Sequence, residues 1–164
     1  MAQSNQRLPR FARIRAEKTM PRGHVEIIQV RPRRLAPTVE VEAWDLRSDA
    51  DHRRSSDRAV TLFQHEHLSV LEKLLGRPVE FSQTRRNLAV RGFNLEVARG
   101  AVLEVGETRL LVTGRCHPCA RMEETLGRGG FTAMLGHGGW TACVVQTGVI
   151  RRGDVVQLHA ATGV

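Results

Sequence analysis

The stretch VLEVGETRLLVTG, residues 102–114, indicates the fold class of this chain. Apolar and polar side chains alternate through Leu103, Glu104 and Val105, which is the period of a strand that buries one face. Gly106 then stands where a tight hairpin turn belongs, and apolar residues resume after it. The stretch therefore predicts a β-hairpin.

Short apolar runs with strand composition occur on both sides of this hairpin. They cover residues 24–32, 38–44, 59–64, 79–81, 87–92, 140–148, 149–154 and 155–159. One amphipathic helix is predicted over residues 66–76, where leucines recur at helical spacing before a glycine. Because short strands outnumber helices, we expect a mainly β fold, an antiparallel barrel-like sheet with one or two short helices.

The net charge of +8 is concentrated near the N-terminus. Residues 1–34 contain nine of the 25 basic residues and two of the 17 acidic ones, so the remainder is nearly neutral. We therefore expect a flexible basic arm over residues 1–21 and a single barrel domain over residues 22–164. Such an arm could touch nucleic acid only non-specifically, and no specific nucleic-acid partner is predicted.

Length and composition limit the class of protein. The 164 residues fit one domain, and no run approaches the roughly 18 apolar residues of a membrane span. No apolar N-terminal stretch indicates export, and three cysteines are too few for a secreted disulfide scaffold. We therefore expect a cytoplasmic protein. Lys18 and Lys73 are the only lysines, and neither is well placed for a Schiff base, so pyridoxal phosphate is not expected within this chain.

The segment GRCHPCARMEE, residues 114–124, contains Cys116 and Cys119. This spacing suits a metal site, a redox disulfide or one reactive thiolate. A zinc site needs four ligands, and the chain has no second Cys-x-x-Cys. A thioredoxin-like motif belongs at the start of a helix in a βαβ unit, a pattern that this chain does not show. Burial of both thiols as small apolar groups is a further alternative.

A reactive thiolate has a structural basis in this segment. Pro118 favours a short helix over residues 118–126, which would place Cys119 in the first turn, where free amide groups stabilise a thiolate. Arg115 and Arg121 would add positive charge, whereas Glu123 would oppose it. The third cysteine, Cys143, lies in an apolar run and is expected in the core.

Six glycines follow between residues 127 and 139, in LGRGGFTAMLGHGG. Glycine-rich backbone can bind phosphate through its N–H groups, but neither the phosphate-loop nor the dinucleotide fingerprint is present. Two interpretations therefore stay open: a mobile functional loop beside the cysteine segment, or a plain connection.

The chain resembles the MOSC domain, named after the C-terminal domain of molybdenum cofactor sulfurases, and is most similar to its short stand-alone bacterial members. The resemblance covers roughly residues 22–159. It rests on GHVEIIQVRP, DHR after a polar loop, AVTLFQHEHL, RRNLAVRGFNL, GRCHPCARMEETLG and GHGGWTACVVQTGVIRRGDVV, in this order. The resemblance implies a β-rich, barrel-like fold.

The resemblance also implies a site. The family's cysteine follows a proline and precedes a basic and an apolar residue, which assigns the catalytic position to Cys119, and molybdenum, if bound, to the same thiol. Cys116 is an additional thiol that could act as the resolving cysteine, by forming a disulfide with Cys119. Cofactor-binding side chains would be Arg85, Arg86, Asn87, Arg91, Arg121 and His137, since guanidinium and amide groups suit a pterin phosphate. Asp51 and His52 are weaker candidates, because Ala50 stands where the family commonly has glycine.

These observations predict a MOSC domain protein that serves molybdenum-cofactor-related binding or sulfur transfer through a reactive cysteine. A link to the reduction of N-hydroxylated compounds follows from the family. The partners would be a cysteine desulfurase, or a molybdoenzyme or reductase, and a small pterin cofactor. The alternative is a non-catalytic binding or partner module of a larger reductase or sulfurase system.

Overall fold

The computed structural model describes residues 22–32, 36–47 and 57–159. The basic arm expected over residues 1–21 and the candidates Asp51 and His52 lie outside the described residues.

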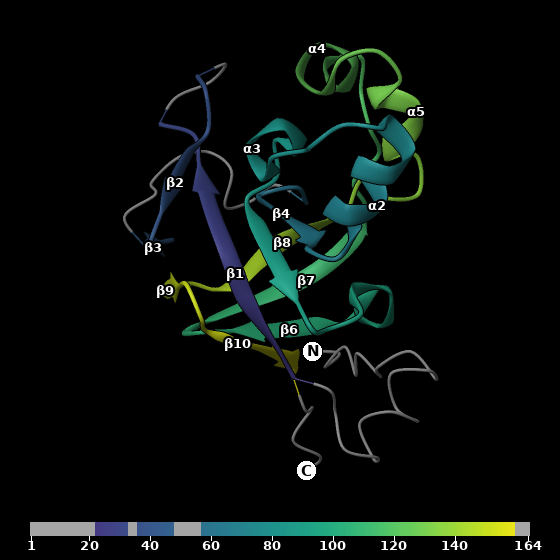
Figure 1. Ribbon diagram of the computed structural model, residues 1–164. Helices are drawn as coiled ribbons and strands as arrows, with labels where there is room; N and C mark the ends of the chain where they lie inside the picture. The colour runs from purple at the N-terminus through teal and green to yellow at the C-terminus, as the bar shows by residue number, and fades with distance from the viewer. Residues whose placement is uncertain (1–21, 33–35, 48–56, 160–164) are drawn as a thin grey trace.

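Strands dominate the described chain (Figure 1). They are β1 (Gly23–Val30), β2 (Val39–Val41), β3 (Ala43–Asp45), β4 (Val60–Gln64), β5 (Leu88–Arg91), β6 (Val102–Val105), β7 (Thr108–Arg115), β8 (Trp140–Gln146), β9 (Val149–Arg151) and β10 (Val155–Leu158). The helices are α2 (His67–Leu75), α3 (Phe81–Thr84), α4 (Arg121–Leu126) and α5 (Gly130–Met134), with a 3₁₀ turn, η1 (Leu95–Ala98). The mainly β prediction is confirmed.

Seven strands close into a barrel. The order β10-β6-β7-β8-β4-β5-β1 returns to its start because β1 also pairs with β10. The pairing of β4 with β5 is parallel, with Leu62 opposite Leu88, and the other barrel pairings are antiparallel. The barrel is therefore mixed rather than wholly antiparallel. Strand β2 extends the sheet beside β1, and β3 pairs with β9 in a separate ribbon.

The predicted hairpin forms the β6–β7 pair of this barrel. Val105 lies opposite Thr108, and Gly106 occupies the turn with a φ of +55°. The Thr108 hydroxyl donates to the Val105 carbonyl over 2.7 Å, which closes the turn. Leu103 and Val105 are fully buried inside the barrel, as their alternation with Glu104 predicts.

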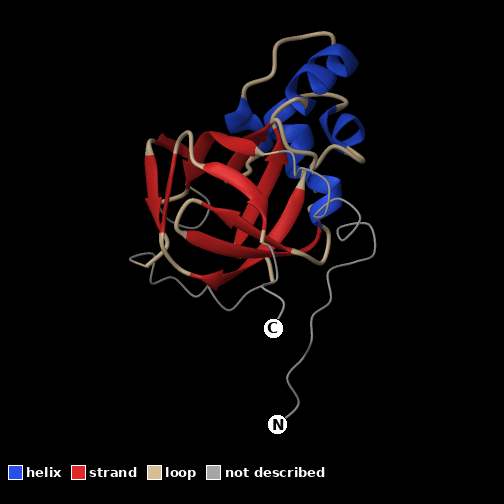
Figure 2. Cartoon of the chain, turned by 90° about the horizontal axis from the view of Figure 1, so that it is seen from below, coloured by secondary structure: helices blue, strands red, loops and turns tan. Residues whose placement is uncertain are grey.

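The four α-helices gather at one end of the barrel (Figure 2). Two apolar clusters follow from this arrangement. One fills the barrel, and the other lies beneath the helices and includes Phe63, Leu71, Phe81, Met122 and Met134. The second cluster fixes the helices against the barrel end, because burying their apolar faces is the main gain available to such short elements.

Three segments differ from their prediction. The run over residues 79–81 was expected to be β, but Phe81 begins α3, because the Gln83 side chain accepts the Glu80 amide over 2.8 Å in a capping box. The helix predicted from Pro118 begins instead at Arg121. The glycine-rich segment contains a helical turn, α5.

None of the helices in the described ranges is long and apolar enough to span a membrane.

Candidate functional site

The barrel end beneath the helices holds a buried arginine. Arg86 precedes β5 and is 6% exposed. Its Nε donates to the Gly138 carbonyl over 2.6 Å, Nη1 to Thr84 over 3.0 Å and Nη2 to Cys116 over 3.4 Å. One guanidinium therefore forms hydrogen bonds with the end of α3, the cysteine segment and the glycine-rich loop.

The charge of Arg86 has no carboxylate partner among the residues that the structure describes. Burial lowers the pKa of Arg86 from its ordinary value, because the charged form loses hydration. The contact between Arg86 and the cysteine segment that the structure shows is the hydrogen bond from Nη2 to the Cys116 carbonyl.

The two cysteines differ in access. Cys116 follows β7 and is 6% exposed, and its amide donates to the Gly139 carbonyl over 2.9 Å. Cys119 is exposed, and its carbonyl accepts the Met122 amide over 2.8 Å. Both thiols are free, as is the half-buried Cys143 on β8.

Cys119 therefore does not occupy the first turn of a helix. Ala120 is the N-cap of α4, and Cys119 lies one residue before it. A helix of six residues has little dipole to offer at that distance. Any stabilisation of a thiolate at Cys119 has to come from nearby side chains.

The charges expected around Cys119 are arranged differently from the prediction. Arg115 donates to both carboxylate oxygens of Glu96, at 2.9 and 2.8 Å, and lies over the Trp140 ring at 4.9 Å. Glu123 accepts the amides of Gly129 and Phe131, and these bonds lower its pKa. The charges of both side chains are thus engaged away from the thiols.

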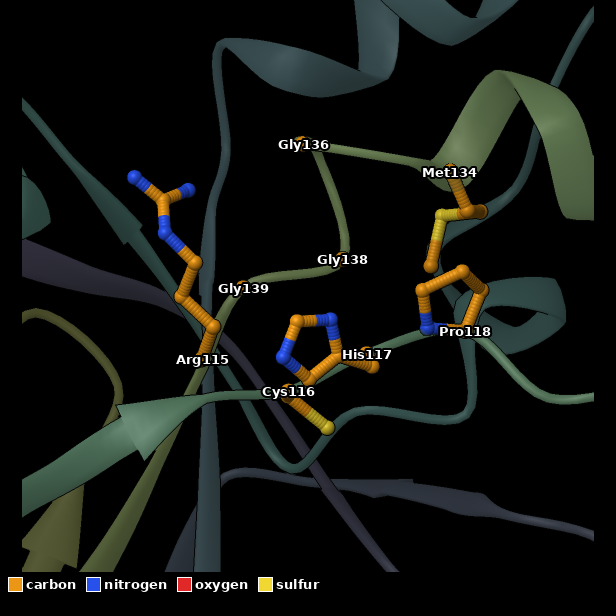
Figure 3. Close-up of a pocket in the computed structure, with 8 residues that line it drawn as sticks. All are labelled: Arg115, Cys116, His117, Pro118, Met134, Gly136, Gly138 and Gly139. Carbon is orange, nitrogen blue, oxygen red and sulfur yellow. The ribbon is translucent and has the colours of Figure 1, made fainter.

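A small pocket lies beside Cys116 (Figure 3). Its volume is about 50 Å³, and it is lined by Arg115, Cys116, His117, Pro118, Met134, Gly136, Gly138 and Gly139. The guanidinium of Arg115 and the sulfur of Cys116 point in opposite directions. This volume admits one or two waters or a sulfur atom, and is well below the roughly 300–1,000 Å³ of typical ligand pockets.

Two consecutive glycines form the wall of this pocket. A Cβ on Gly138 would lie 2.2 Å from the Cys116 carbonyl oxygen. Gly139 has a φ of +85°, and its Cβ would lie 2.1 Å from the Leu62 carbonyl oxygen. Only glycine permits this close approach, so the segment is packed against the cysteine strand. The glycines are evident in the sequence, but these contacts and the position of His117 in the pocket lining join segments that no local pattern connects.

Asn87 and Arg91 are engaged elsewhere. The Asn87 Oδ1 accepts the amide and hydroxyl of Thr61 over 3.0 and 2.9 Å, and its Nδ2 donates to Gln29 over 3.1 Å. Arg91 lies at the other end of β5, where it pairs with Glu26 over 3.3 Å and contacts His65 over 3.2 Å. Along a strand, the five residue-to-residue steps from Arg86 to Arg91 span about 16 Å.

The other candidates remain near the helical end. Arg85 caps α3 with a φ of +59°, and its Nη2 is buried without a hydrogen-bond partner among the described residues. Arg121 is exposed at the start of α4. His137 meets His67 edge to face, with ring centroids 4.8 Å apart, and burial lowers the pKa of His67. The site therefore brings together Arg86, Cys116 and the loop that carries Gly138 and His137, and Cys119 lies three residues after Cys116.

Within the described ranges, no three side chains of His, Cys, Asp or Glu gather closely enough to hold a metal ion.

The protein is therefore a small β-barrel domain, with seven strands in a mixed barrel and a cysteine segment beneath the helices at one end. The sequence matches the MOSC domain family over residues 49–157, so the chain belongs to that family. No curated protein matches the sequence significantly.

Solved structures share the fold. The YUAD protein from Bacillus subtilis is similar with a TM-score of 0.72 and 16% identity, covering 88% of this chain and 99% of its own. YiiM from Geobacillus stearothermophilus has a TM-score of 0.70 and 19% identity, covering 84% of this chain and 75% of its own. YiiM from Escherichia coli has a TM-score of 0.60 and 17% identity, over 89% and 72%.

Proposed function

We propose that this protein carries sulfur as a persulfide on Cys119. The observation that supports this most is that the Cys119 thiol is exposed and free, three residues after Cys116, whose carbonyl accepts a hydrogen bond from the buried Arg86. An exposed thiol is accessible to a donor protein, and the nucleophile in sulfur transfer is the thiolate, which nearby positive charge favours.

The transfer needs no oxidant or reductant. The Cys119 thiolate attacks the outer sulfur of a persulfide on the donor, such as a cysteine desulfurase. A sulfur–sulfur bond forms on Cys119 as the donor's sulfur–sulfur bond breaks, and the donor leaves as a thiolate. The Cys119 persulfide then passes its outer sulfur to an acceptor by the same reaction. Cys116, three residues away, could instead discharge it as a disulfide and hydrosulfide.

The MOSC family is associated with the molybdenum cofactor. The described residues do not fit that group as a set, because Arg91 lies at the other end of β5 and both functions of the Asn87 amide are engaged. Three N–H groups of Arg86 also donate to backbone carbonyls, and the pocket of about 50 Å³ is too small for a pterin. No step of the proposed sulfur transfer therefore involves this cofactor, and the reduction of N-hydroxylated compounds implied by the family resemblance is not part of the proposed function.

The alternative function, a partner module, has its own support. Phe131 and Leu135 on and after α5 are 39% and 51% exposed, and they flank Met134, which lines the pocket. Exposed apolar side chains next to a site favour protein binding. A reductase or sulfurase partner would bind there without chemistry at Cys119.

Incubation with a cysteine desulfurase and cysteine tests the proposal. Mass spectrometry of the tryptic peptide over residues 116–121 should show one added sulfur, on Cys119. Cys119→Ser should abolish loading while the fold survives, and Cys116→Ser should retain it. If Cys119→Ser loads as well as wild type, the carrier function is excluded. If nothing loads but molybdenum or pterin co-purifies, Cys119 is better interpreted as a cofactor ligand. If neither is found, the partner module is favoured.

A further inference from the structure

The cysteine segment lies against α5. Met134, the last residue of α5, and Pro118, the residue before Cys119, line the same small pocket (Figure 3). The Phe131 amide donates to the carboxylate of Glu123 over 2.9 Å, and Glu123 lies in α4, four residues after Cys119. Contacts from both ends of α5 therefore reach the chain on either side of the exposed Cys119.

The outer face of α5 is apolar. Phe131, in the first turn of α5, and Leu135, its C-cap, are both exposed. Residues four apart lie on the same face of a helix, so these two side chains form one surface, the α5 surface. Helix α5 packs against α2, which adds the exposed Leu74. Single exposed apolar side chains are ordinary, but several of them beside an accessible thiol favour a protein-binding surface.

Exposed cations flank the α5 surface. Arg121 begins α4, Arg128 lies between α4 and α5, and Arg77 follows α2 and donates to carbonyls at and just after the end of α4. All three are exposed, and none forms an ion pair with a carboxylate among the described residues. Both oxygens of Glu123 accept amides at the start of α5 instead. A surface with an apolar centre and unpaired cations around it is complementary to an apolar patch bordered by carboxylates.

We propose that the α5 surface is where the sulfur donor of Cys119 docks, and that this donor is a protein with an apolar patch bordered by acidic side chains. The inference rests on the proposed function and adds the docking surface and the chemistry of the partner. A donor protein has to bring its persulfide sulfur into contact with Cys119, so it covers the elements next to this thiol. The α5 surface supplies the apolar contact that holds the donor, and the arginines supply its orientation.

The charges argue against a second copy of this chain as the occupant. In a two-fold dimer the same surface faces itself, so the unpaired arginines of both copies would come together. Like charges that face each other across an interface repel, and this repulsion opposes the gain from covering Phe131 and Leu135. A donor with acidic side chains covers the same apolar residues without this cost.

Two sulfur donors, one a protein and one a small molecule, test the inference. The full-length protein is loaded either by a purified cysteine desulfurase with cysteine or by inorganic polysulfide, which gives one sulfur to a thiolate and releases hydrosulfide. Phe131→Asp/Leu135→Asp places two carboxylates on the α5 surface, and Arg128→Glu reverses one of the flanking charges. Mass spectrometry of the tryptic peptide over residues 116–121 gives the initial rate of loading in each protein.

Val145→Asp is the matched control. Val145 is 56% exposed, similar to Leu135 at 51%, but it lies on β8 at the barrel end away from the cysteine segment. Its neighbour Gln146 pairs with Arg109 near the start of β7, whereas Cys116 follows the last residue of β7. The same substitution there adds a carboxylate without touching the proposed docking surface.

The two donors should respond differently. Phe131→Asp/Leu135→Asp should slow loading by the desulfurase about tenfold or more at limiting donor, and Arg128→Glu about threefold, because most of the contact energy of an interface resides in a few residues. Loading by polysulfide should stay close to wild type, and Val145→Asp should match wild type with both donors. An equal loss with both donors would show that these residues shape the thiol site, and it would overturn the inference. A desulfurase rate that no substitution changes would also overturn it.

Binding separates this inference from the carrier function. If neither donor loads wild type, the carrier function fails, but wild type should still bind the desulfurase in a fluorescence anisotropy titration, and Phe131→Asp/Leu135→Asp should not. Absent or equal binding contradicts the docking surface, as does a wild-type dimer in sedimentation that the double variant abolishes.

Salt dependence applies if the double variant does not fold. Loading of wild type by the desulfurase should fall at least about threefold between about 50 and 300 mM sodium chloride, since salt screens the attraction between the arginines and an acidic donor. A rate that is independent of salt contradicts the acidic character of the partner.

Discussion

Two arginines at opposite ends of β5 are in contrasting environments. Arg86, just before the strand, is 6% exposed and donates to three carbonyls. Arg91, the last residue of the strand, has a side chain 46% exposed and pairs with Glu26, whose carboxylate also contacts His24 at 3.0 Å. At the far end the arginine is paired with a carboxylate at the surface, whereas at the helical end the buried arginine has no carboxylate partner among the described residues and donates to the Cys116 carbonyl.

The contrast separates a charge that is paired at the surface from one that is buried without a carboxylate partner among the described residues. Exposed ion pairs such as Arg91 with Glu26 contribute about 0–1 kcal/mol, since water already solvates both partners. Burying a cation without a carboxylate costs hydration free energy that its hydrogen bonds to carbonyls only partly offset, so charge pairing does not explain this position. The helical end is therefore the better candidate for function, independently of the cysteine motif.

The largest predicted effect is on stability at Arg86. Arg86→Met should lower the free energy of unfolding by about 3 kcal/mol, because three buried carbonyls lose their donor and three segments lose their link. Arg91→Met should cost less than about 1 kcal/mol. Urea denaturation at neutral pH measures both. Equal costs at the two positions would contradict the distinction between the two ends.

The next largest predicted effect is the loss of stability when alanine replaces Gly139 or Gly153. Both have a left-handed φ, +85° and +86°, but only Gly139 is crowded, with a Cβ position 2.1 Å from the Leu62 oxygen. Gly139→Ala should cost about 2–3 kcal/mol, and Gly153→Ala about 1 kcal/mol from backbone conformation alone. Thermal melting of both variants checks this. If Gly153→Ala is the more destabilised, the pocket wall is not tightly packed.

A smaller effect concerns thiol selectivity at the helical end. Cys119 should react with limiting iodoacetamide at least about tenfold faster than Cys116 or Cys143 at neutral pH, because Cys119 is exposed whereas Cys116 is buried and Cys143 is half-buried. Glu26→Gln, at the other end of the barrel, should leave this ratio unchanged. Peptide mapping that finds Cys116 modified first would reverse the assignment.

The smallest effect is the acid response of the far end. Burial alone would raise the pKa of Glu26, but the hydrogen bond from His24 and the charge on Arg91 hold it below its ordinary value of 4.5. A carboxyl whose pKa is lowered by folding stabilises the protein above its unfolded pKa, and this is lost as the pH falls through the folded pKa. Glu26→Gln should therefore lower stability at neutral pH by less than about 1 kcal/mol, and the difference from wild type should vanish in acid. Urea midpoints from pH 3 to 7 measure this, and a difference that persists at pH 3 would contradict it.

Local patterns predicted the elements of the barrel well, because alternation and turn residues act over a few positions. Leu103, Val105 and Gly106 specify the β6–β7 hairpin in this way. The same patterns wrongly predicted a strand over residues 79–81, where α3 begins. The single turn of α3 depends on a capping box between Glu80 and Gln83 rather than on hydrophobic periodicity. They also began the helix after Pro118 three residues early, because proline is compatible with a helix start without requiring one.

The sequence by itself determined the fold class, the hairpins, the leucine-lined helix and the cysteine segment, because each depends on residues close together in the chain. Tertiary structure alone decided which charges reach the thiols. It paired Arg115 with Glu96, directed Glu123 to the start of α5 and placed Arg91 at the opposite end of β5. It also brought Arg86 against Gly138 and Cys116, which are 52 and 30 residues away. Such contacts depend on how the barrel closes, and barrel closure joins segments whose separation no local pattern encodes.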